Sequence, residues 1–121
     1  MSSPATQFGK DPKRVNIDDD PTDPKKLVVD NDEFWVSKKN KEVAEWFCKR
    51  NHNHGANQPC FTVKFDKAMG SPFESVSFSS DNHGHASSDK INVEPDDSKI
   101  YEYRVQAPGK DDLDPGGGVR Q

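Results

Sequence analysis

The sequence predicts an all-β fold, a two-sheet β-sandwich of about seven short strands with antiparallel or mixed pairing. Three observations predict it. Apolar and polar residues alternate in several short runs, which is the two-residue period of half-buried strands. These runs are rich in aromatic and β-branched side chains and are bounded by Gly, Pro, Asn, Asp or Ser. Helical periodicity is weak, since the best candidate, over 41–48, extends for only about two turns.

The alternation assigns each strand in turn. The clearest run is Phe61, Val63 and Phe65, which alternate with Thr62 and Lys64. In chain order we expect strands at 27–30, 34–37, 43–49, 60–66, 74–79, 90–94 and 99–106. The side chains that we expect to form the centre of the core are Trp46, Phe61, Val63, Phe65, Phe78, Tyr101 and Tyr103.

The chain divides into a body and two polar ends. Apolar residues gather in a body at 27–107, so we expect one domain there. Residues 1–26 contain four prolines and an acidic triplet, which is typical of a flexible leader, although Val15 and Ile17 alternate like a short edge strand. Residues 108–121 form a Gly- and Pro-rich tail that leaves room for a short last strand.

Composition and charge exclude several classes of protein. With 17 Lys and Arg against 21 Asp and Glu, the net charge of −4 disfavours a nucleic-acid partner. No apolar run approaches the roughly 18 residues of a spanning helix, so we expect no membrane partner. No secretory signal is visible, which makes the cytoplasm the default expectation. A disulfide would instead favour a processed extracytoplasmic protein.

Short motifs along the body carry a family resemblance. In chain order these motifs are Trp46, Phe61-Thr62-Val63-Lys64-Phe65, Ser71-Pro72-Phe73 followed by Phe78, Tyr101-Glu102-Tyr103-Arg104-Val105, and Leu113-Asp114-Pro115. Over residues 28–119 the chain resembles small bacterial β-sandwich proteins of cupredoxin-like fold, most of which have no assigned function. The resemblance implies a cupredoxin-like or Ig-like sandwich and supplies no catalytic residues. The chain departs from the family pattern at 116–118, where three glycines stand in place of an apolar last strand.

A cupredoxin-like fold raises the possibility of a type 1 copper site. Such a site needs two His, one Cys and a weak axial ligand such as Met in one trigonal arrangement. In the family these ligands gather before the last strand, but the segment after Val105 contains no Cys, His or Met. We therefore expect no type 1 copper site.

The two cysteines flank one connection between predicted strands. If the strand that ends at Cys48 pairs as a hairpin with the strand that begins at Cys60, the two residues lie opposite each other. Opposed Cα atoms about 4.5 Å apart fall within the range of about 4.4–6.8 Å for disulfides. This favours a disulfide that contributes on the order of 3 kcal/mol. The open alternatives are two free thiols in a reducing cytosol and two thiolate metal ligands.

The four histidines form two His-x-His pairs, and the predicted meander places both pairs at one end of the sandwich. They are His52 with His54 and His83 with His85. Four imidazoles, or two imidazoles with the two cysteines, have the chemistry to hold zinc, copper or nickel. The alternative is that the histidines are exposed turn residues and that the protein has no cofactor.

Catalytic signatures are missing from the sequence. There is no Gly-x-Ser-x-Gly elbow, no phosphate-binding loop and no His-Glu-x-x-His motif. We therefore expect a non-enzymatic interaction or accessory module, which takes a protein partner through a sheet edge. Trp35 and Phe8 are candidates for a partner surface. The alternative is a metal-binding protein that uses the two histidine pairs. The oligomeric state does not follow from the sequence.

Overall fold

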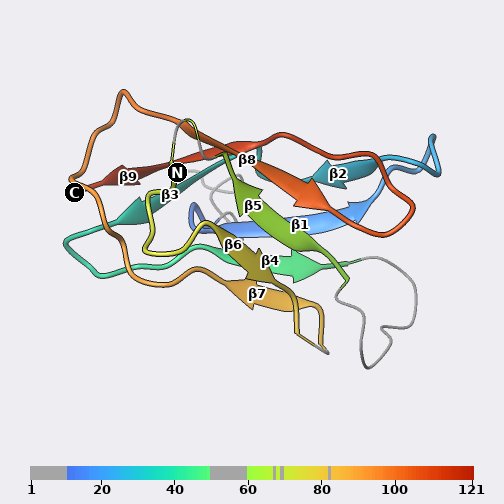
Figure 1. Ribbon diagram of the computed structural model, residues 1–121, viewed down its shortest axis with the longest axis horizontal. Helices are drawn as coiled ribbons and strands as arrows, with labels where there is room; N and C mark the ends of the chain where they lie inside the picture. The colour runs from blue at the N-terminus through green and yellow to red at the C-terminus, as the bar shows by residue number, and fades with distance from the viewer. Residues whose placement is uncertain (1–10, 50–59, 67, 69, 82) are drawn as a thin grey trace, which may run out of the picture.

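The computed structural model describes residues 11–49, 60–66, 68, 70–81 and 83–121. These residues contain nine strands and no helix, so the predicted all-β fold is confirmed (Figure 1). The strands are β1 (Arg14–Asp19), β2 (Leu27–Val29), β3 (Glu33–Ser37), β4 (Glu45–Cys48), β5 (Thr62–Phe65), β6 (Ser77–Ser79), β7 (His85–Ser87), β8 (Tyr101–Gln106) and β9 (Gly116–Arg120).

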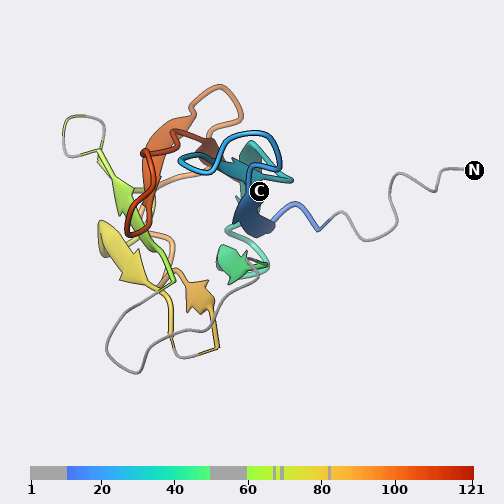
Figure 2. The ribbon, with the colours of Figure 1, turned by 90° about the vertical axis from the view of Figure 1, so that its right-hand side faces the viewer.

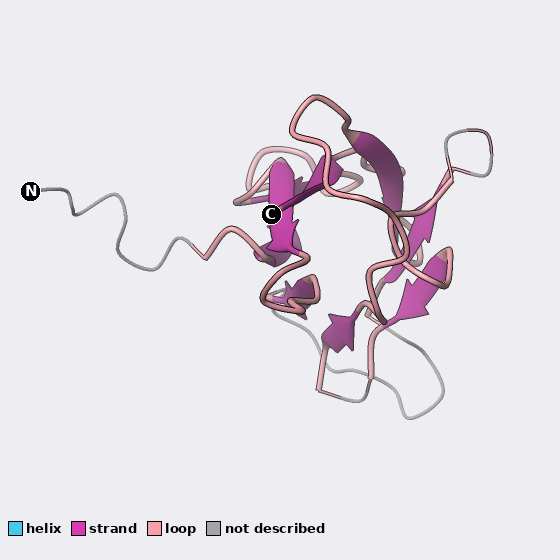
Figure 3. Cartoon of the chain, turned by 90° about the vertical axis from the view of Figure 1, so that its left-hand side faces the viewer, coloured by secondary structure: helices cyan, strands magenta, loops and turns pink. Residues whose placement is uncertain are grey.

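The strands form two mixed sheets. One sheet has four strands in the order β2-β1-β4-β7, and the other has five in the order β3-β9-β8-β5-β6. The pairs β1–β4 and β3–β9 are parallel, and the other paired strands are antiparallel. Seen from the side views, the strands lie around a central core (Figures 2 and 3).

Six of the seven predicted strands are present, five of them shorter than predicted and β3 one residue longer, and the seventh is not. Residues 90–94 form no strand, because Ile91 makes only an isolated bridge to Phe73. On either side of this bridge, Glu74 N–H donates to the Lys90 carbonyl and Asn92 N–H donates to that of Pro72. The segment is thus attached at one point and does not extend either sheet.

The N-terminal segment is more deeply integrated than expected. β1 lies between β2 and β4, and Val15 and Ile17 are completely buried. For these residues the leader and edge-strand interpretations are both wrong, because β1 has a hydrogen-bonded neighbour on each side. The part of the predicted leader at 1–10 lies outside the described residues.

The C-terminal glycines also belong to an interior strand. β9 lies between β3 and β8, with Gly117 beside Phe34 and Gly118 beside Trp35. A Cβ atom at Gly117 would lie 2.1 Å from the Phe34 ring, and one at Gly118 would lie 2.3 Å from the Trp35 ring. The glycines are therefore strand residues whose missing side chains make room for two aromatic rings.

The core lies between the two sheets and is dominated by aromatic rings. Of the seven expected core side chains, six are at most 5% exposed, and Phe78 is partly buried against them. The core also includes Phe34, which was not among the seven side chains expected at its centre, and whose ring centroid is 5.8 Å from that of Trp46 and 5.7 Å from that of Tyr103. The Trp46 indole Nε1 also donates a hydrogen bond to Tyr103 Oη at 3.2 Å.

Candidate functional site

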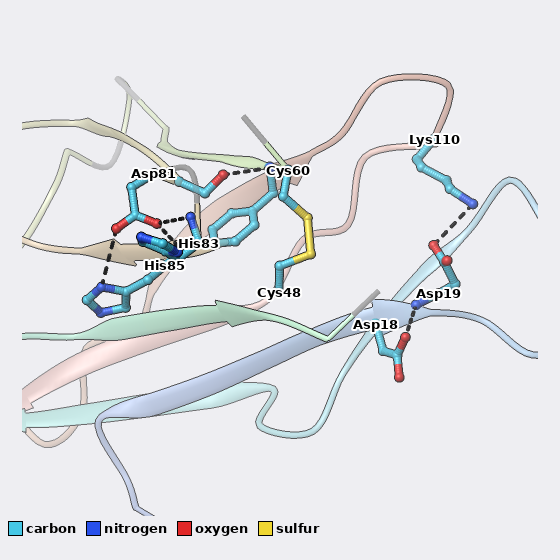
Figure 4. Close-up of a disulfide and its surroundings, with 10 residues drawn as sticks. Asp18, Asp19, Cys48, Cys60, Asp81, His83, His85 and Lys110 are labelled. Carbon is cyan, nitrogen blue, oxygen red and sulfur yellow. Dashed lines mark hydrogen bonds and ion pairs between the residues drawn. A yellow bond between two sulfur atoms is a disulfide. The ribbon is translucent and has the colours of Figure 1, made fainter. Parts of the chain in front are cut away.

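The expected disulfide joins Cys48 and Cys60, with Cα atoms 6.6 Å apart (Figure 4). The hairpin that led to this expectation is wrong, because β4 and β5 belong to different sheets. Cys48 ends β4, and Cys60 lies two residues before β5. The bond is therefore a covalent link between the two sheets. Because both sulfur atoms are used in it, neither is a thiolate ligand.

The turn between β6 and β7 is built around Asp81 (Figure 4). Its Oδ1 accepts the backbone N–H groups of His83 and His85 at 2.8 and 3.0 Å, and its own N–H donates to the His85 carbonyl. The N–H donors of His85 and His83 hold the pKa of Asp81 below its ordinary value. Gly84, which has a positive φ of 74°, accepts a bond from Cys48 N–H at 2.7 Å. The turn is thus fixed beside the disulfide.

The His85 side chain lies on the other side of its sheet from the disulfide. Trp46 and Cys48 pack against the core, and strand alternation places Phe47 on the outer face. His85 is the cross-strand partner of Phe47, and their rings stack with centroids 4.7 Å apart. Nε2 of His85 is buried without a hydrogen bond and lies 3.5 Å from Glu45 Oε2.

The predicted metal site is therefore only partly visible. His52 and His54 lie outside the described residues. Within the described part of the chain, no group of three or more His, Cys, Asp or Glu side chains is arranged to hold a metal ion. Zinc, copper or nickel binding by the two histidine pairs stays a prediction.

The outer edge of β3 is occupied by neighbouring parts of the chain. Trp35 N–H donates to the Pro12 carbonyl at 2.8 Å, and Ser37 N–H donates to Glu42 Oε1 at 2.8 Å. An edge whose donors are already used is a poor template for a partner strand.

The edge of β2 is bounded in a similar way by the connection from β8 to β9. Before β2, the Lys25 carbonyl accepts a bond from Asp111 N–H at 2.7 Å. The connection from β8 to β9 is therefore anchored beside the start of this short edge.

The last two edges, β6 and β7, approach each other at a gap that we call the seam. Val76 and Ser80 make backbone bonds to the strand beside β6, so the N–H and C=O groups of Ser77 and Ser79 point away from it. No residue that the structure describes bonds these four groups. Beyond the seam, Ser75 is tied to Asp89 by two hydrogen bonds. These bonds close the seam at the end next to Ser75, and the Asp81 turn closes it at the other end.

The outer face of the five-stranded sheet is hollowed. A larger hollow of about 390 Å³ lies over β5 and β8, and a smaller hollow of about 200 Å³ lies beside the start of β9. Glu102 and Asp114 line both, so the two hollows adjoin. Lys64 and Arg104 line the larger one, and Gly116 lines the smaller one. Sequence reasoning missed this face, because its residues come together only through the pairing of β5, β8 and β9.

Trp35 lies near these hollows in the way that the strand alternation predicts. Phe34 and Val36 are completely buried, whereas Trp35 is only partly buried and covers Gly118. Its indole Nε1 donates to Glu33 Oε1 at 2.8 Å. Phe8, the other candidate for a partner surface, lies outside the described residues.

No helix long and apolar enough to cross a membrane occurs in the described ranges. Comparison of the chain with protein-family models, with curated proteins and with solved structures gave no match. The cupredoxin-like relationship therefore stays a prediction, and the fold and the surface described above are the basis for a functional proposal.

Proposed function

We propose that the protein is a non-enzymatic interaction or accessory module, a cupredoxin-like sandwich without a type 1 copper site. Its partner is a protein segment that lies on the outer face of the five-stranded sheet. The observation that carries this proposal is the pair of adjoining hollows that meet at Glu102 and Asp114. Concave surfaces that combine apolar walls with a few polar groups are the usual places for ligands.

The face is favoured over the sheet edges on physical grounds. The edge of β3 is bonded by the chain itself, the connection from β8 to β9 is anchored beside the start of the β2 edge, and the seam at β6 is closed at both ends. A segment on the face needs no rearrangement of these contacts. Most pre-organised complexes form with little backbone movement, which supports the outer face as the partner surface.

The charges on this face supply a means of orienting a partner. Lys64 and Arg104 are neighbours on β5 and β8, whereas Glu102 and Asp114 mark the side towards β9. Arg104 lies 4.0 Å from Asp114, so the two signs meet in the middle of the face. Because basic residues lie on one side of the face and acidic residues on the other, the charges fix the direction in which a complementary segment binds more than they add to its affinity.

The test is site-specific photo-crosslinking in extracts of the source cells. A photoreactive amino acid replaces Lys64 or Gln106 on the outer face of the five-stranded sheet. The matched control places it at Asp18, which is exposed on the four-stranded sheet. We expect one protein to be crosslinked from both positions on the five-stranded sheet and not from Asp18.

Two results would overturn the proposal. One is a partner that crosslinks only from Asp18, and the other is no adduct from either position on the five-stranded sheet. Purified partner then gives a second readout: reversing the charge with Arg104→Glu should weaken its binding, whereas Glu74→Gln, which lines neither hollow, should not.

A further inference from the structure

Two glutamates flank a glycine on the outer face of the five-stranded sheet. The register pairs Gly116 with Glu33 on one side and with Glu102 on the other. Since neighbouring strands are about 4.8 Å apart, the two glutamates stand roughly 10 Å from each other. Gly116 leaves the space between them without a side chain of its own.

The space between the glutamates is a hollow whose walls are partly apolar and partly acidic. It is the smaller hollow of about 200 Å³, and Ile100, Leu113 and Pro115 contribute to its lining. A Cβ atom at Gly116 would lie 2.6 Å from Ile100 Cγ2, so the Ile100 side chain lies over the glycine and forms part of the wall of the hollow. The apolar part of this wall suits an aliphatic chain.

The charged residues that line the smaller hollow are all acidic. Its lining includes four carboxylates, those of Asp32, Glu33, Glu102 and Asp114. Glu33 accepts the Trp35 indole N–H, and Asp114 lies 4.0 Å from Arg104. Among the described residues, Asp32 and Glu102 have no cation within ion-pair distance. Within the described part of the chain, two carboxylates thus face the hollow without a counter-charge.

The aromatic ring of Trp35 lies over the next outward-facing residue of β9. The Trp35 indole covers Gly118, which is two residues from Gly116 on the same face of β9. In an extended peptide, side chains two residues apart are about 6.6 Å from each other and share a face. A peptide that lies along β9 would therefore present one side chain to the hollow and the next on that face to the indole. An indole face attracts cations as well as apolar groups.

We propose that the smaller hollow receives the side chain of a lysine or arginine from an extended segment of the partner. The aliphatic stem packs on Ile100 and Pro115, and the charged head lies between Glu102 and Asp32. This inference rests on the proposed function, because it names the chemistry of the segment that binds the same face. It assigns the specificity to the carboxylates of the smaller hollow.

The test uses synthetic nine-residue peptides of alternating threonine and valine with one central lysine, and a control peptide in which neutral norleucine replaces the lysine. Binding to the whole chain is followed by NMR chemical shifts of backbone amides and the two indole N–H groups. We expect saturable shifts at Gly116, Glu102 and the Trp35 indole with the lysine peptide. The norleucine peptide should bind about five- to tenfold more weakly. Raising the salt from about 50 to about 500 mM should reduce the difference.

Matched variants locate the interaction. Glu102→Gln with Asp32→Asn removes the two unpartnered charges and should weaken the lysine peptide to the level of the norleucine peptide. Glu74→Gln, a glutamate that lines neither hollow, should leave the affinity unchanged. The dispersed amide spectrum of each variant shows directly that it is folded.

The outcomes separate this inference from the proposed function. Equal affinity for the two peptides, an unchanged affinity in the double variant, or no saturable shift up to about 10 mM peptide overturns the inference. If a crosslinked partner nevertheless binds at Lys64 and Gln106, the proposed function stands and only the cationic specificity fails. If no partner crosslinks there but the lysine peptide saturates the hollow, the proposed function fails and the cation site remains.

Discussion

Trp46 and Tyr103 are hydrogen-bonded to each other through the centre of the sandwich. Trp46 is on β4 of the four-stranded sheet and Tyr103 is on β8 of the five-stranded sheet, and each is at most 1% exposed. The buried indole N–H thus has an acceptor, and the buried phenol oxygen has a donor. Burial also raises the pKa of Tyr103 well above the ordinary range, so the phenol stays neutral.

Tyr103→Phe should lower the free energy of unfolding by about 1–3 kcal/mol, because it leaves the indole N–H of Trp46 buried without an acceptor. Urea unfolding followed by tryptophan fluorescence measures the change. Tyr101→Phe is the matched control, since Tyr101 is also buried but no hydrogen bond of its hydroxyl occurs in the described contacts. If the two variants lose equal stability, the contact between Trp46 and Tyr103 contributes nothing specific.

Gly117→Ala should destabilise the protein by about 1–3 kcal/mol or more through overpacking. The added Cβ would lie within 2.4 Å of three carbon atoms of the buried Phe34 ring. Phe34→Leu removes the ring and creates space for the added methyl group, so the double variant should lose less than the sum of the single losses. Thermal unfolding of the parent, the two single variants and the double variant measures this double-mutant cycle. Strictly additive losses of stability would contradict the packing of the Phe34 ring against Gly117.

Reduction of the Cys48–Cys60 bond should lower the free energy of unfolding by on the order of 3 kcal/mol, because it restores the entropy of the connection that the bond closes. Denaturant curves with and without a dithiol reductant measure the loss. A protein without the bond, Cys48→Ala with Cys60→Ala, should show the same reduced stability and no response to reductant. Thiol titration of the unreduced, denatured protein should find no free thiol, and two free thiols would contradict the disulfide.

The Asp81 turn should make stability depend on acid pH. Because the folded pKa of Asp81 is lowered, its contribution is present above the ordinary aspartate pKa of about 3.9 and is lost as the pH falls through the folded value. Asp81→Ala should therefore lower the melting temperature at pH 7, and its difference from the parent should shrink below about pH 4. Asp97→Ala, at an exposed aspartate, is the control. A difference that is constant with pH would show that the charge of Asp81 is not involved.

The sequence predicted best the strands in which apolar side chains alternate clearly with charged side chains. β5 and β8 carry Val63, Tyr101 and Tyr103 inward and charged residues outward, so the period is unambiguous. β7 was missed because its only apolar residue is Ala86. For β9 the sequence predicts only a tail with room for a short last strand, because glycines ordinarily mark turns, and the rings that fill their places come from a strand about 80 residues earlier in the chain.

The cysteine pair and the outer face show two different limits of sequence reasoning. The sequence brought Cys48 and Cys60 together through a hairpin, whereas the structure joins them between sheets, so the correct pair came from the wrong geometry. Glu33, Gly116 and Glu102 gave no sequence signal, since nothing local places them in one row. Such a row forms only when strands that are far apart in the sequence pair with one another. Pairing of this kind produces no periodic pattern of residues from which it could be predicted.

The interior position of β9 has a consequence for biosynthesis. Because β9 supplies the hydrogen-bonded bridge between β3 and β8, the five-stranded sheet cannot be completed until residues 116–120 have left the ribosome. Until then the emerging chain exposes Phe34 and Val36 on a strand without its partner, which is the kind of surface that aggregates. Because this pairing joins segments about 80 residues apart, we expect the final closure of the sheet to be slow.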